Sequence, residues 1–399
     1  MSSIPLPLPS SVTSLVQRRA VAALVFSVAM LGTNIPTPLY GLYHEQFGLS
    51  PLMVTVTFAV FAAGVAASLT AFGHLSDEVG RRPVLIGGVV VSGLAATAFL
   101  LADGQALLIL GRLLSGLSAG LFVGAGTATV VDLSPPEHRA QAATIAVVAN
   151  FGGLTAGAIG SGLVAQYLGD PLRLPYWIDL ALVALALLGL CVVPETVTRR
   201  RRARVRMRPT VPSEVRGIFV RLSLAGGSGF AATGLLAATA SLFISQELHH
   251  DNLALFGLPA GLTFASVAVG QVLVRRLPER LAIPGGSVGM LVAIALIALS
   301  LASRTLAPLL VGSAVLGFAA GLSIGAGLPA ITRLSPEARR AETASTFFLV
   351  LYLMLALPVV GVGALTQVVG LRSAGLAFSA AIATLLAACL VEQLRHQGE

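Results

Sequence analysis

GHLSDEVGRRPVL, residues 73–85, is a short charged stretch between two long apolar runs. Within ten residues it contains Gly73, Asp77, Gly80, Arg81 and Arg82. Because so short a turn makes the flanking helices antiparallel neighbours, Gly80 stands where the chain needs a positive φ. Asp77 can accept hydrogen bonds from Arg81 or Arg82, or lie against the positive end of another helix. We expect a charged latch that forms in one conformation and breaks in another; the alternative is a plain solvated turn.

The composition of the chain is that of a membrane protein. Hydrophobic residues make up 56% and charged residues only 11% of 399 residues, and the mean hydropathy is +0.90. These values exclude an ordinary soluble domain. Apolar runs of about 20 residues, the length that spans a hydrocarbon core, recur about a dozen times. The sequence therefore predicts an all-α integral membrane protein with twelve transmembrane helices.

The basic residues indicate how the chain is oriented. All 25 are arginine, and all but four fall on one side of the predicted topology. Arg173, Arg304 and Arg372 fall on the other side, and Arg112 lies within a span. Positively charged loops mark the cytoplasmic side. We expect both termini to be cytoplasmic and the protein to lie in a bacterial plasma (inner) membrane.

The second half of the chain repeats the first. A shift of 201 residues lays six small residues on six others: Gly116, Ala119, Gly120, Gly124, Ala125 and Gly126 on Gly317, Ala320, Gly321, Gly325, Ala326 and Gly327. The same shift matches Leu133-Ser134-Pro135 to Leu334-Ser335-Pro336. A register held through a helix and the next turn predicts two pseudo-symmetric six-helix bundles.

The repeat and the Arg cluster from Arg199 to Arg208 divide the chain into five segments. We expect a disordered cytoplasmic N-terminus, an N-terminal bundle, an Arg-rich cytoplasmic linker, a C-terminal bundle and a cytoplasmic tail: residues 1–17, 18–194, 195–216, 217–392 and 393–399. The linker enforces topology, and a regulatory or lipid-binding role is the alternative.

The opening stretch resembles the signature of the major facilitator superfamily, Gly-x-x-x-Asp-x-x-Gly-Arg-Arg between the second and third membrane helices. Gly73, Asp77, Gly80, Arg81 and Arg82 fill all of its positions. The resemblance implies a secondary transporter that works by alternating access. The related stretch in the second half, residues 270–280, has no acid matching Asp77, so the latch is expected in one half only.

Two intramembrane charges are candidates for energy coupling. Arg112 lies inside a span, where a charge costs about 2.5–3.5 kcal/mol on insertion scales, so we expect it to face the bundle interior. Its setting, with Gly116 and Gly120, resembles a helix-4 motif of exporters in which such an arginine is linked to proton coupling or substrate charge. Asp179 is the only carboxylate clearly within an apolar span. The alternatives are an Arg112 that reaches the outer interface and an Asp179 that caps the outer face.

Two further groups of residues have predicted roles. Small residues at four-residue spacing let helices pack closely, which applies to Gly116, Gly120, Gly124, Gly153, Gly157, Gly317, Gly321 and Gly325. Sparse polar residues are expected to line the substrate pathway: Asn34, Tyr40, Asn150, Gln166, Tyr352 and Gln367. Since none of these is charged, they favour a neutral or amphipathic substrate.

The sequence thus predicts a proton-coupled exporter of small hydrophobic or amphipathic compounds. The alternative is a uniporter or symporter for a sugar-like or other neutral metabolite. A helix-5 alanine, Ala158, where the antiporter signature has proline, argues against antiport. An enzyme or receptor is a remote alternative. We expect a monomer in the lipid bilayer with a small-molecule substrate and possible proton coupling, and no catalytic residues, cofactor, metal site or nucleic-acid partner.

Overall fold

The computed structural model describes residues 10–72, 75–197 and 210–395, and the regular elements among them are all helices. In chain order they are α1 (Ser10–Asn34), α2 (Pro36–Phe47), α3 (Pro51–Phe72), α4 (Leu75–Glu78), α5 (Arg81–Leu100), α6 (Gln105–Asp132), η1 (Pro136–His138), α7 (Arg139–Tyr167), α8 (Leu174–Leu190), η2 (Ser213–Val215), α9 (Arg216–Gln246), α10 (Leu253–Phe256), α11 (Leu258–Leu273), η3 (Val274–Arg276), α12 (Glu279–Ser303), α13 (Leu306–Leu334), η4 (Glu337–Arg339), α14 (Arg340–Val369) and α15 (Leu371–Arg395).

Eleven helical stretches in the described part of the chain are long and apolar enough to cross a membrane. The sixth span in chain order, α8, has the same character but only 17 residues. The first span is broken between α1 and α2 at Ile35. The break follows from Pro36 and Pro38, which cannot donate the backbone hydrogen bonds that a continuous helix needs.

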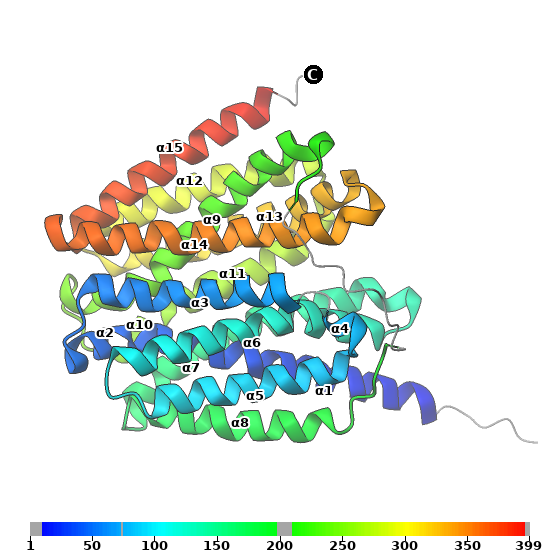
Figure 1. Ribbon diagram of the computed structural model, residues 1–399. Helices are drawn as coiled ribbons and strands as arrows, with labels where there is room; N and C mark the ends of the chain where they lie inside the picture. Colours follow the sequence, from blue (N-terminus) through cyan, green and yellow to red (C-terminus); the bar gives the residue numbers. More distant parts are fainter. Residues whose placement is uncertain (1–9, 73–74, 198–209, 396–399) are drawn as a thin grey trace, which may run out of the picture.

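The helices alternate in direction, so their turns collect at two ends of the molecule. Arg81, Arg139, Arg216 and Arg340 all begin helices at one end, and Figure 1 shows α4, the start of α1 and the end of α15 there as well. We call this the Arg-rich end. The opposite, Arg-poor end carries the turns at Gly48, Gly169 and Gly370, which have positive φ angles.

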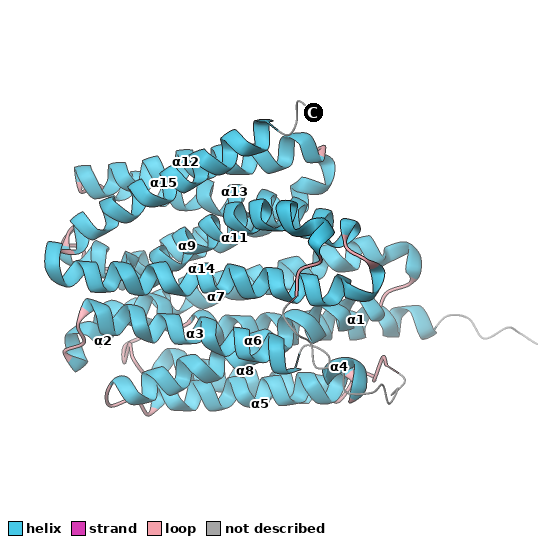
Figure 2. Ribbon diagram, turned by 45° about the horizontal axis from the view of Figure 1, so that its top comes forward, coloured by secondary structure: helices cyan, strands magenta, loops and turns pink. Residues whose placement is uncertain are grey.

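The helices form two bundles. In the N half, α1, α3, α5, α6, α7 and α8 pack on one another; in the C half, α9, α11, α12, α13, α14 and α15 do so. Figures 1 and 2 show the two bundles as separate layers, with α3 and α14 side by side where they meet. α7 packs on α10 and α11, and α2 packs on α9, across the same boundary.

The repeated glycines make matching contacts in the two bundles. A Cβ at Gly116 of α6 would overlap the backbone of α3 at Phe61, and one at Gly317 of α13 would overlap α11 at Thr263. Gly120 lies against α3 and Gly321 against α11 in the same way, while Gly153 and Gly157 of α7 lie against the backbone of α1. Gly325 lies against the side chain of Val274 in η3. Such contacts let membrane helices approach closely. Gly124 is the exception: no atom of the described chain lies within 4 Å of an added Cβ, so it makes no such contact.

Candidate functional site

A cavity of about 500 Å³ lies between the two bundles. Its walls are mainly apolar and aromatic, and include Phe58, Phe61, Phe230, Phe264 and Phe348. From Arg112 and Asn34 it extends along α7 and α13 to Gln271 and Arg275 near the Arg-rich end. A space of this size and character suits a small organic molecule.

The cavity is lined by two cationic side chains, Arg112 and Arg275, and no acidic residue of the described chain joins them. Its uncharged polar groups come from threonine, asparagine, glutamine and tyrosine side chains: Thr33, Asn34, Thr127, Asn150, Thr233, Gln271 and Tyr352. The lining is therefore positively charged as a whole.

Arg112 of α6 is only 1% exposed. Its Nη1 donates a 2.9 Å hydrogen bond to the carbonyl oxygen of Thr33, next to the α1–α2 break. Its guanidinium lies 5.0 Å from the ring centre of Tyr40, with Phe58 and Phe99 at 5.8 and 5.9 Å. Aromatic faces attract cations. The Nε and Nη2 atoms have no hydrogen-bond partner in the described chain, and no described carboxylate lies within 4.0 Å.

Asp179 of α8 is also 1% exposed, but it does not line the cavity. Its carboxylate lies against Gly32 of α1, where an added Cβ would come within 2.8 Å of Oδ2. Its Oδ1 has no hydrogen-bond partner among the described residues. Asp179 and Arg112 are not ion-paired, yet they contact adjacent residues of α1, Gly32 and Thr33.

Three of the six expected pathway residues line the cavity: Asn34, Asn150 and Tyr352. Asn34 is held by hydrogen bonds to Leu154 and Thr37. Tyr40 is buried behind the cavity wall against Arg112. Gln166 and Gln367 do not line the cavity either; both lie at the Arg-poor end and contact the opposite bundle.

The Arg-poor end is closed by two matching contacts between the bundles. On one side, Gly162 of α7 faces the backbone of Leu253, and Gln166 Oε1 accepts a 2.6 Å hydrogen bond from the Leu253 amide. On the other side, a Cβ at Gly363 of α14 would overlap Thr55 of α3, and Gln367 Nε2 donates to Ser50 Oγ at 3.4 Å. We name these two contacts the α7 clasp and the α14 clasp.

The clasps follow the 201-residue repeat. Gly162, Gln166 and Gly169 of α7 correspond to Gly363, Gln367 and Gly370 of α14. Gly169 and Gly370, with φ of 77° and 81°, end the two helices. This second match was visible in the sequence and would have assigned the glutamines to contacts between bundles rather than to the pathway.

At the Arg-rich end, the side chain of Arg275 bridges the two bundles. Arg275 Nη1 donates to the Ala140 carbonyl at 2.7 Å and to Thr144 Oγ1 at 2.9 Å, joining η3 to the start of α7. Arg275 is exposed. This contact between the bundles therefore depends on an exposed side chain.

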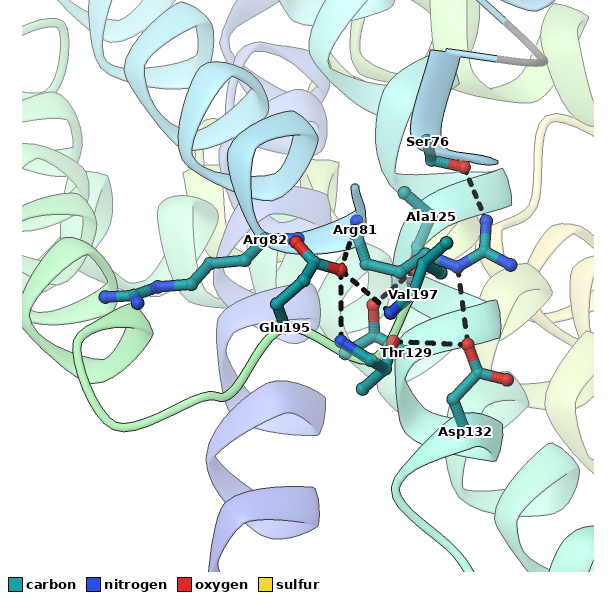
Figure 3. A network of polar contacts seen from close by, with 9 residues as sticks. Ser76, Arg81, Arg82, Ala125, Thr129, Asp132, Glu195 and Val197 are labelled. Atoms are coloured by element: carbon teal, nitrogen blue, oxygen red, sulfur yellow. Dashed lines mark hydrogen bonds and ion pairs between the residues drawn. The ribbon is translucent and has the colours of Figure 1, made fainter. Parts of the chain in front are cut away.

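The described residues of the expected latch take part in a polar network. Gly80 has φ 113°, and the Arg81 side chain runs between Ser76 Oγ, at 2.6 Å, and Asp132 of α6, at 3.3 Å (Figure 3). The Glu195 carboxylate accepts hydrogen bonds from the backbone amides of Arg81 and Arg82, at 2.8 and 3.2 Å. A carboxylate is favoured at a helix N-terminus, here that of α5.

Only some of the residues of the predicted latch can be located in this network. Gly73 and the side chain of Asp77 lie outside the described residues. Asp132 and Glu195 were missed from the sequence, since they follow spans far along the chain. Glu195 stands in a Pro194-Glu195-Thr196 stretch at the end of the sixth span, which was the available signal.

Comparison with known proteins agrees with this architecture. A stretch of 129 residues is 32% identical to the inner membrane transport protein YajR of Escherichia coli, covering 32% of this chain and 28% of YajR. The quinolone resistance protein NorA of Staphylococcus aureus is 24% identical over 148 residues, 37% of this chain and 36% of NorA. The chain thus matches about a third of the length of these relatives.

Solved structures show the same fold over nearly the whole chain. A bacterial homologue of the human lysosomal transporter Spinster, in an inward-facing occupied conformation, has a TM-score of 0.70 at 16% identity and covers 94% of this chain and 96% of its own. The human organic anion transporter MFSD10 has a TM-score of 0.65 at 19% identity, covering 94% and 99%. The family model of the Major Facilitator Superfamily matches residues 22–357. This chain belongs to the Major Facilitator Superfamily of membrane transporters.

Proposed function

We propose that this transporter exports small amphipathic compounds from a bacterial cell, with both termini cytoplasmic, and that proton entry drives export. The observation that carries the proposal is the cavity between the bundles, with its aromatic walls and few polar groups. The two clasps close it at the Arg-poor end, and its lining continues to Arg275 at the other. Rocking of the bundles about this cavity would give alternating access.

The direction of transport is supported by the relatives. NorA is described as a quinolone resistance protein, and resistance to a drug is a property expected of an exporter. The cavity favours an amphipathic compound over a sugar, because a sugar needs many hydrogen-bonding partners and six phenylalanines occupy these walls.

For coupling, we propose that Asp179 carries the proton and that the broken first span links it to the cavity. The carboxylate lies against Gly32, and Arg112 is hydrogen-bonded to the carbonyl of Thr33. A change of charge on Asp179 acts on α1 beside the α1–α2 break, where a helix deforms most easily. The next residue of the same turn, Thr33, accepts the hydrogen bond from Arg112 in the cavity wall.

The test is reconstituted flux with Asp179→Asn, which removes the charge at nearly constant volume. In proteoliposomes loaded with a quinolone, a pH gradient should drive wild-type uphill transport, and the variant should lose it by about a hundred-fold or more, as expected when an obligatory proton carrier is removed. Counterflow exchange should continue, since exchange needs no net proton movement. Asp103→Asn, at an exposed turn of the Arg-poor end, is the matched control.

Two results would separate the parts of this proposal. A variant that still concentrates the quinolone against a gradient would show that Asp179 is structural. A wild-type protein that moves glucose but no quinolone would overturn export of amphipathic compounds and favour the metabolite alternative.

A further inference from the structure

We propose that Arg112 is the binding site for an anionic group of the substrate, so that the transported compounds are amphipathic organic anions. This inference rests on the proposed function and names its substrate class. It narrows the neutral or amphipathic substrate that the sequence favoured, because Arg112 was linked there to proton coupling or substrate charge and was not counted among the residues of the pathway.

The donors left over on Arg112 are the first reason. Nη1 is used by the Thr33 carbonyl, whereas Nε and Nη2 have no partner in the described chain. Those two atoms form one edge of the planar guanidinium, and their N–H bonds are parallel. Such an edge matches the two oxygens of a carboxylate, or two oxygens of a sulfonate or phosphonate.

The energetics of burial are the second reason. A buried charge is normally paired or hydrogen-bonded, and leaving it unpaired is costly. The rings of Tyr40, Phe58 and Phe99 surround the guanidinium and attract it, and the Tyr40 hydroxyl lies near it, but none of these groups supplies the negative charge that a buried arginine lacks. An anionic ligand would accept hydrogen bonds from Nε and Nη2 of Arg112 and would supply the negative charge that pairs with the guanidinium.

The third reason is the positive net charge of the cavity lining. The lining holds two arginines and, within the described chain, no aspartate or glutamate. Because the walls are apolar and screen charge poorly, this field favours anions and disfavours cations. The phenylalanines of α3, α9, α11 and α14 would then hold the apolar part of the same molecule.

The test compares three ligands of similar shape and different charge: 1-naphthaleneacetate, its neutral amide 1-naphthaleneacetamide, and 2-(1-naphthyl)ethylammonium. Binding to the purified full chain is measured by displacement of radiolabelled 1-naphthaleneacetate, and flux is measured in proteoliposomes. A charge-assisted pair contributes enough to make the carboxylate bind about ten- to a hundred-fold more tightly than the amide.

Variants of Arg112 test whether the preference arises there. Arg112→Gln should remove the preference of carboxylate over amide, and Arg112→Lys should keep only part of it, because an ammonium lacks the bidentate edge. Arg275→Gln, at the other end of the cavity, should retain most of it. A purely structural role of Arg112 would instead weaken binding of all three ligands equally.

The outcomes distinguish this inference from the proposed function. If the wild-type protein binds or transports the amide or the ammonium compound as well as the carboxylate, export stands and the anion site is wrong. If it transports none of the three and no quinolone, both proposals fail. The comparison of ligands on the wild-type protein decides the question even if an Arg112 variant does not fold.

Discussion

At the Arg-poor end the bundles meet closely, with Gly162 against the backbone of Leu253 and Gly363 against the side chain of Thr55. At the Arg-rich end one exposed side chain, Arg275, reaches across to α7. Close glycine contacts depend on shape and exclude water, whereas an exposed arginine can exchange its partners for water at little cost. From this difference we expect this conformation to open more readily at the Arg-rich end, and the two clasps to separate when the protein leaves it.

The largest expected effect comes from adding bulk to the α14 clasp. Gly363→Leu would collide with Thr55 and disfavour closure by about 1–3 kcal/mol, the usual penalty of overpacking. The reporter is Thr233→Cys in the cavity wall, in a protein from which Cys191 and Cys389 have been removed. Its reaction with a maleimide measures how accessible the cavity is from each side of the membrane. Labelling by an impermeant maleimide from the Arg-poor side should rise roughly ten-fold or more.

The matched control for this variant lies two residues away on the same helix. Gly361 has no atom within 4 Å of an added Cβ, so Gly361→Leu should change labelling by less than about two-fold. The repeat offers the same pair on α7, where Gly160 is open and Gly162 is not. Equal effects of Gly361→Leu and Gly363→Leu would show that the clasp does not hold this end closed.

The next effect in size distinguishes the two clasps from each other. The hydrogen bond from the Leu253 amide to Gln166 is 2.6 Å long, whereas that from Gln367 to Ser50 is 3.4 Å. Gln166→Leu leaves an amide without its partner, a loss of about 1 kcal/mol, and should raise labelling from the Arg-poor side about five-fold. Gln367→Leu should raise it less than about two-fold. A larger effect of Gln367→Leu than of Gln166→Leu would show that the α14 clasp, and not the α7 clasp, has the stronger hydrogen bond.

Much of the fold could be predicted because hydropathy and the repeat act over long stretches. The spans follow from apolar run lengths, and the break in the first span follows from Pro36 and Pro38. The repeat assigned Gly116 and Gly317 to corresponding helices, which the packing of both glycines confirms. It could not show that Gly124 faces open space, because the face of a helix that packs depends on how its neighbours are rotated.

The site was less predictable because its contacts join residues far apart in the chain. Arg81 was expected to pair with Asp77, but its guanidinium also reaches Asp132, 51 residues away. The depth of Arg112 could be estimated from the sequence, but not which of its donors remain free. That depends on where the Thr33 carbonyl and three aromatic rings lie, and these come from other helices.

The smallest expected effect concerns the Arg-rich end itself. Arg275→Gln removes two hydrogen bonds from one exposed guanidinium, which water replaces readily, so the closing contact should weaken by only about 0.5–1 kcal/mol. Labelling of the Thr233 reporter from the Arg-rich side should rise about two- to five-fold. Arg276, the next residue, is also exposed and makes no described bridge to the N half, so Arg276→Gln is the matched control. If Arg275→Gln instead opens its end as strongly as Gly363→Leu opens the other, the two ends are equally firm, and the asymmetry inferred from their chemistry is wrong.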